Sequence, residues 1–105
     1  MPPTTDPWTT PPIIERFDNW TGELSNDWRF GTLSSPTTAM YLKEIDVSAT
    51  YLSGSEVTSG TVQTSRTISA MIGGEEFVLR WKVLQDGKTQ VKQTMIRVLK
   101  SGSVR

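Results

Sequence analysis

Hydrophobic and polar side chains alternate most clearly in the last third of the chain. Every second position of one segment is apolar or aromatic: Phe77, Leu79, Trp81 and Val83. Residues 89–99 alternate in the same way, with Thr94, Ile96 and Val98 on one side. Between the two segments, Asp86-Gly87 forms a loop that favours a type I′ turn, because glycine adopts positive φ without a Cβ clash. The pattern predicts a β-hairpin with Trp81 in its core face.

Earlier segments predict further short strands. Alternating apolar positions predict a half-solvated strand over residues 45–51, and residues 24–33 predict a short strand or an irregular edge piece. Residues 56–72 predict two short strands with a break near Ser59-Gly60 or Thr64-Ser65, whereas residues 34–38 and Gly73-Gly74 predict a loop and a turn. Short strands at roughly ten-residue spacing are typical of an all-β sandwich, and no segment predicts a helix longer than about two turns.

The N-terminal segment has a different character. Five of the six prolines lie among the first twelve residues, which predicts an extended arm rather than a helix or an alternating strand. Residues 13–20 have apolar side chains three to four positions apart and are compatible with a short helical turn. We divide the chain into an arm (1–23), a sandwich domain (24–100) and a polar tail (101–105). The arm residues expected to bind a neighbouring subunit are Pro7, Trp8, Pro11, Pro12, Ile13 and Ile14, with Trp8 as the anchor.

The composition argues against an enzyme. The chain has 105 residues, one domain's worth, and neither cysteine nor histidine, so it has no thiolate nucleophile, no disulfide and no Ser–His–Asp triad. The adjacent acids Glu75 and Glu76 begin a strand and should point to opposite faces, where they cannot share a proton. We therefore predict no catalytic residues, no cofactor and no metal site.

The charge and hydropathy patterns restrict the possible partners. Eleven basic and eleven acidic residues give a net charge of zero, which offers no field for steering nucleic acid or an anionic membrane. No apolar run is long enough to span a bilayer, and the first residues do not form a signal peptide, so we expect synthesis in the cytoplasm. Only 35% of the residues are hydrophobic, so assembly with other proteins could supply part of the burial.

Three aromatic side chains leave a choice open. Trp20, Trp28 and Tyr51 could belong to the core, to a protein interface or to a platform that stacks on sugar rings. An exposed coplanar pair would favour a small carbohydrate-binding module. Burial or contact with other chains would favour assembly.

A resemblance to a known group of proteins enters at the C-terminal third. Residues 73–88 read GGEEFVLRWKVLQDGK, and a return strand ending in Ile96-Arg97-Val98 follows. This order of Gly-rich turn, aromatic-led strand, Gly-plus-basic hairpin and closing strand resembles small Ig-like structural proteins of tailed bacteriophages, among them the fiber–tail adaptor proteins. The resemblance implies an Ig-like antiparallel sandwich. It also implies a non-catalytic virion protein, present in multiple copies, that docks on neighbouring tail or capsid subunits in an adaptor or decoration role.

Overall fold

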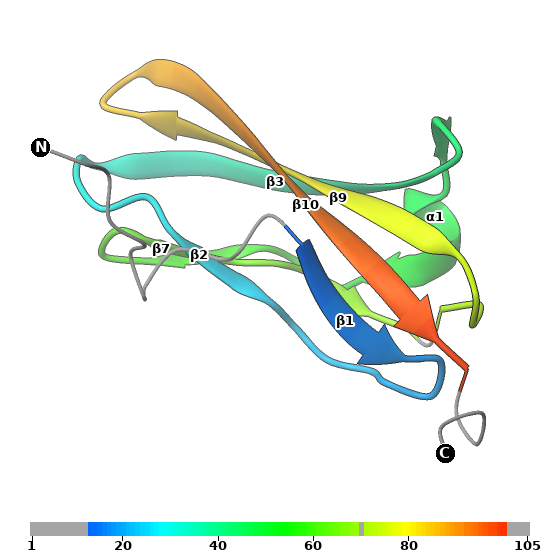
Figure 1. The fold of residues 1–105 in the computed structure, drawn as a ribbon. Coiled ribbons are helices and arrows are strands. Elements are labelled where there is room, and N and C mark those ends of the chain that lie inside the picture. The colour runs from blue at the N-terminus through cyan, green and yellow to red at the C-terminus, as the bar shows by residue number, and fades with distance from the viewer. Residues whose placement is uncertain (1–12, 70, 101–105) are drawn as a thin grey trace, which may run out of the picture.

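The predicted hairpin forms the centre of the larger of two β-layers (Figure 1). The computed structural model describes residues 13–69 and 71–100, and within them β9 (Glu76–Gln85) pairs antiparallel with β10 (Lys88–Leu99). The turn between them has positive φ at both Asp86 (51°) and Gly87 (81°), as a type I′ turn requires. Both the hairpin and its turn are therefore confirmed.

Three more strands complete the five-stranded sheet. Its order is β1-β10-β9-β3-β4, where β1 is Ile13–Phe17, β3 is Leu33–Leu42 and β4 is Ile45–Asp46. The pairs are antiparallel except for β1, which runs parallel to the C-terminal half of β10. The first and last described strands of the chain therefore lie side by side.

The second layer is assembled from shorter pieces. One sheet has the order β2-β7-β6, where β2 is Ser25–Asp27, β7 is Val62–Thr64 and β6 is Val57–Ser59. The strands β5 (Leu52–Ser53) and β8 (Thr67–Ile68) form a separate pair, and the four-residue helix α1 (Ser48–Tyr51) precedes β5. One break was predicted, at residues 59–60 or 64–65; both are present, so the described residues of this segment, 56–69 and 71–72, hold three strands instead of two.

The core lies between the two layers. The odd-numbered residues of β9 supply Phe77, Leu79, Trp81 and Val83, all buried, and β10 supplies Thr94, Ile96 and Val98. The Trp81 indole Nε1 donates a hydrogen bond to Thr94 Oγ1 at 3.1 Å, so its one polar atom is satisfied within the sheet. The alternation seen in the sequence therefore sets which face of the hairpin is buried, and the predicted all-β sandwich is confirmed.

Two further local predictions are wrong. Residues 13–17 form β1 instead of a helical turn, because β10 offers them a ladder of backbone hydrogen bonds and eight residues alone cannot nucleate a stable helix. Residues 34–38 belong to β3, where Ser35 has a φ of 50° and a bulge between Ser34 and Thr37 accommodates Pro36. Residues 34–38 were predicted to be a loop because the sequence showed only their turn-forming composition.

The strand expected over residues 45–51 divides into β4 and α1. The Asp46 carboxylate accepts hydrogen bonds from the hydroxyl and the backbone amide of Ser48, which lower the pKa of Asp46. The Met40 amide donates to Ser48 Oγ, and the Val47 amide donates to the Met40 carbonyl, each at 2.8 Å. These side chain-to-backbone bonds favour a tight turn over a continued ladder.

The predicted arm, residues 1–23, is only partly described. Its residues 13–17 are β1, a part of the sandwich, and Pro7, Trp8, Pro11 and Pro12 lie outside the described residues. The same holds for the polar tail, residues 101–105.

Candidate interaction surface

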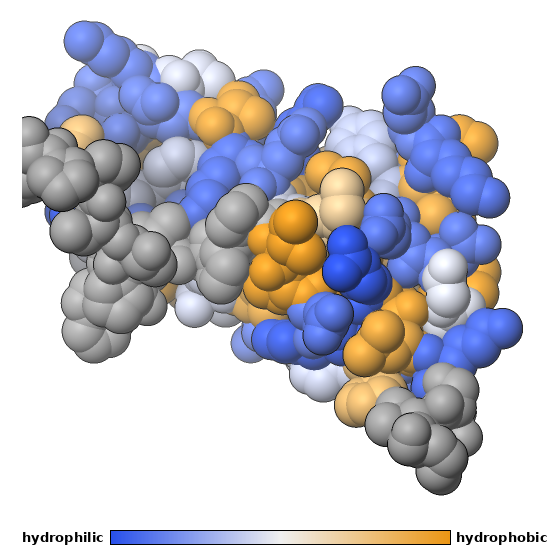
Figure 2. All heavy atoms as spheres, viewed as in Figure 1, coloured by the Kyte–Doolittle hydropathy of each residue, from blue (hydrophilic) through white to orange (hydrophobic). Residues whose placement is uncertain are grey.

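A row of apolar side chains crosses the outward face of the five-stranded sheet. The register places Ile13 beside Met95, Met95 beside Val78 and Val78 beside Tyr41, one residue from each of four adjacent strands. Ile13 is 51% exposed and the other three are half-buried. Figure 2 shows hydrophobic residues gathered over β1 and the neighbouring part of β10, with hydrophilic residues around them. We call these four residues the apolar row.

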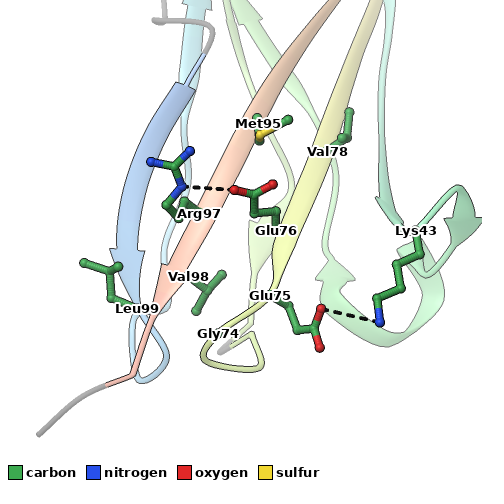
Figure 3. Close-up of a pocket in the computed structure, with 9 residues that line it drawn as sticks. All are labelled: Lys43, Gly74, Glu75, Glu76, Val78, Met95, Arg97, Val98 and Leu99. Carbon is green, nitrogen blue, oxygen red and sulfur yellow. Dashed lines mark hydrogen bonds and ion pairs between the residues drawn. The ribbon is translucent and has the colours of Figure 1, made fainter. Parts of the chain in front are cut away.

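Charged residues lie along one side of the apolar row, toward the C-terminal end of β10. Arg97 Nε lies 3.0 Å from Glu76 Oε2, and Arg97 Nη1 lies 3.7 Å from Glu15 Oε2. Lys43 and Glu75 line a shallow hollow of about 600 Å³ on this side of the row, and Lys43 Nζ lies 3.8 Å from Glu75 Oε1 (Figure 3). These pairs are largely solvent-exposed, so each contributes little to the stability of the fold.

Tyr41, at the β3 end of the apolar row, makes a cation–π contact. The Arg80 guanidinium lies 4.9 Å from the centroid of the Tyr41 ring, within the range of a cation–π contact. The row therefore ends in a half-buried aromatic ring that already has a cation–π partner within the chain.

The acidic residues of this surface are arranged as ion pairs. Glu75 faces Lys43 and Glu76 faces Arg97, so the two adjacent carboxylates take different partners. Among the described residues, no group of three or more potential metal ligands comes together. In the same part of the chain, no helix has the length and apolar composition to cross a membrane.

The two predicted arm residues that are described lie at the edge of this surface. Ile13 is the first residue of the apolar row and lies on the outward face of the sheet. Ile14 points the other way, because side chains alternate along a strand, and packs against the core of its own sandwich. Of this pair only Ile13 is exposed on the outward face.

The three aromatics of the sugar-platform hypothesis are half-buried and packed against the core. Trp20 is covered by the Arg16 guanidinium at 5.0 Å, and the Trp28 indole Nε1 donates to Gln63 Oε1 at 2.8 Å. Tyr51 stands edge-on to Phe77, with ring centroids 5.1 Å apart. Each ring is therefore committed to contacts within its own chain.

Sequence reasoning missed Tyr41, Val78 and Met95 as surface residues. The available signal was Val78, an apolar residue on the opposite face of β9 from Trp81, where a solvated strand would carry polar residues. Tyr41 and Met95 carried no such signal, because only the strand register brings them to either side of Val78.

Comparison with known proteins does not extend the resemblance of residues 73–88. No protein-family model matches the chain, and no curated protein matches its sequence.

Proposed function

We propose that this chain is a non-catalytic structural protein of a tailed bacteriophage particle, which docks on neighbouring tail or capsid subunits. The observation that carries the docking role is the apolar row, a partly exposed hydrophobic stripe with charged residues beside it on the outward face of the sheet. The resemblance of residues 73–88 to Ig-like phage proteins supplies the setting. In this setting the chain is made in the host cytoplasm, is present in many copies and ends in the virion. Its partners are other particle proteins, not nucleic acid or membrane.

The size of the sheet fits a docking surface. The five strands hold 39 residues, which at about 4.8 Å between strands and about 3.3 Å per residue cover about 600 Å². One partner of a standard protein–protein interface contributes about 800 Å². The sheet face thus supplies most of the area of a specific contact, whereas a sheet face with an open, shallow hollow gives little of the enclosure that small-molecule sites have.

The alternative, a carbohydrate-binding module, has less support. Its candidate rings Trp20, Trp28 and Tyr51 pack against the core, and the Trp28 nitrogen is already hydrogen-bonded. We therefore favour protein docking.

The test uses the phage or prophage that encodes the chain. Purified particles should contain this protein, and deleting residues 1–12 should leave the sandwich folded while lowering its occupancy on the particle at least several-fold. Quantitative mass spectrometry of purified particles and circular dichroism of the isolated variant measure the two effects. Particles that lack the protein would refute the virion role, and full occupancy after the deletion would refute a role for the arm.

The apolar row has a test of its own. Replacing Ile13 with Lys puts a charge in the row and should lower particle occupancy roughly tenfold, as expected when about 1.4 kcal/mol of binding free energy is lost. Val57→Lys is the matched control, since Val57 is similarly exposed (57%) but lies on β6 of the other layer. Equal occupancy of the two variants would show that the row is not the docking surface.

A further inference from the structure

Among the described residues, one edge of the five-stranded sheet is open along the first half of β10. β1 pairs with residues 95–99 only, so within the described part of the chain residues 88–94 have a neighbouring strand on the β9 side alone. Figure 1 shows the hairpin extending well beyond the start of β1. The register with β9 is continuous over these residues, with no bulge to twist the edge away from a partner.

Two sets of hydrogen bonds show which backbone groups face this edge. The Asp18 amide donates to the Leu99 carbonyl at 3.0 Å, so Leu99 faces β1. The Val98 amide and carbonyl bond instead to Glu75 and Gly74, on the β9 side. Because alternate residues of a strand face opposite edges, odd-numbered residues of β10 face the β1 side. Thr89, Val91 and Gln93 therefore direct their N–H and C=O groups to the open edge.

The N-terminal segment has the complementary pattern in its sequence. Every proline in residues 3–11 is at an odd position: Pro3, Pro7 and Pro11. The even positions hold residues with a free amide: Thr4, Asp6, Trp8 and Thr10. A strand bonded on one edge needs amides at alternate positions only, and proline at the others prevents a further strand from adding. The segment is therefore suited to be an edge strand that pairs through its even residues.

Proline at position 12 does not fit the hydrogen-bond pattern that β1 makes with β10. In the β1 register, even residues donate to β10, so position 12 would have to donate to the Gln93 carbonyl. Proline has no N–H and cannot make that bond. The sequence therefore disfavours an in-line extension of β1 beyond Ile13, the first residue of the strand.

We infer that residues 6–10 of a neighbouring copy add to the open edge of β10 as a sixth, antiparallel strand. This rests on the proposed function, in which the arm binds a neighbour, and it names the partner as a second copy of the chain. Asp6, Trp8 and Thr10 pair with Gln93, Val91 and Thr89, and the Trp8 ring covers Val91, which is 54% exposed. Because the arm and the edge are different surfaces, each copy binds the next head to tail, closing a ring or forming a filament.

The first test compares two proline substitutions at adjacent arm positions. Thr10→Pro removes an amide that faces β10 and should weaken self-association of the full chain at least tenfold. Thr9→Pro changes an amide that faces solvent and should alter it less than about twofold. Sedimentation velocity over a concentration series measures both. Equal effects of the two substitutions, or a wild-type chain that stays monomeric up to about 1 mM, would overturn the pairing.

The second test blocks the open edge of β10 and distinguishes pairing between two copies from pairing within one copy. Val91→Pro keeps the hydrogen bonds to β9, because the Val91 amide faces the open edge. It should nevertheless abolish self-association. If Val91→Pro melts at a lower temperature than the wild type, Thr89→Pro is the second variant. Mixing the Thr10→Pro chain, with its edge intact, and the Val91→Pro chain, with its arm intact, should give a 1:1 dimer that grows no further. Two monomers in the mixture would mean that each arm folds onto its own β10 and would overturn the inference.

The outcome is separable from that of the proposed function. A chain that does not self-associate but is present in particles refutes the second copy as partner and leaves the virion role standing. A chain that self-associates through Thr10 and Val91 but is missing from particles refutes the virion role and leaves the second copy as partner.

Discussion

Replacing Trp81 with Ala is expected to lower the free energy of unfolding by about 3–5 kcal/mol, the range for truncating a large aromatic in a core. Trp81 is fully buried at the middle of β9, between Leu79 and Val83 on the same face. The substitution also leaves Thr94 Oγ1 without its indole donor in a buried site. Since domains of this size are stable by only about 5–15 kcal/mol, a large part of the stability disappears. Urea denaturation followed by circular dichroism measures the loss.

Trp81→Phe is the control that separates volume from hydrogen bonding. Phenylalanine keeps most of the ring in the core but cannot donate to Thr94, so we expect a smaller loss of about 1–2 kcal/mol. An unchanged unfolding midpoint for Trp81→Ala would show that the residue does not support the core.

The predictability of each element follows from where its stabilising contacts come from. The hairpin of β9 and β10 was predictable because its pairing, its turn and its buried face all lie within 24 consecutive residues. The identity of β1 was not, because its partner is at the other end of the chain and contributes nothing to the local pattern. The helix α1 could not be predicted for a related reason. Ser48 Oγ accepts a hydrogen bond from the Met40 amide in β3, and the alternation of hydrophobic and polar residues does not predict such a contact.

The candidate surface was predictable from only one of its strands. β9 turns Trp81 inward and Val78 outward, and the presence of apolar residues on both faces was visible in the sequence. The apolar row appears only when β1, β10 and β3 are placed beside β9 in register. A surface built from several strands depends on how those strands pair. The pattern of a single strand can therefore identify Val78 but not its neighbours in the row.

Buried polar residues are the other feature that sequence could not reveal. Gln63 is fully buried in β7, although glutamine is usually exposed. Its Oε1 accepts from the Trp28 indole, and its Nε2 donates to the carbonyls of Thr37 and Lys82, at 3.1 and 3.3 Å. These carbonyls lie beside the bulge of β3, so Gln63 joins the two layers where the larger sheet is irregular.

Gln63→Leu should therefore lower the free energy of unfolding by about 2–4 kcal/mol. Leucine has a similar volume but no polar atoms, so the indole N–H and the two carbonyls lose a buried partner, each at a cost of about 1–3 kcal/mol before relaxation. Gln93→Leu is the matched control, since it makes the same change on the exposed outward face of β10 and should stay within about 0.5 kcal/mol. Chemical denaturation measures both, and the Trp28 indole resonance in an NMR spectrum reports the lost bond. A Gln63→Leu chain as stable as the wild type, with that resonance unmoved, would show that Gln63 does not connect the two layers.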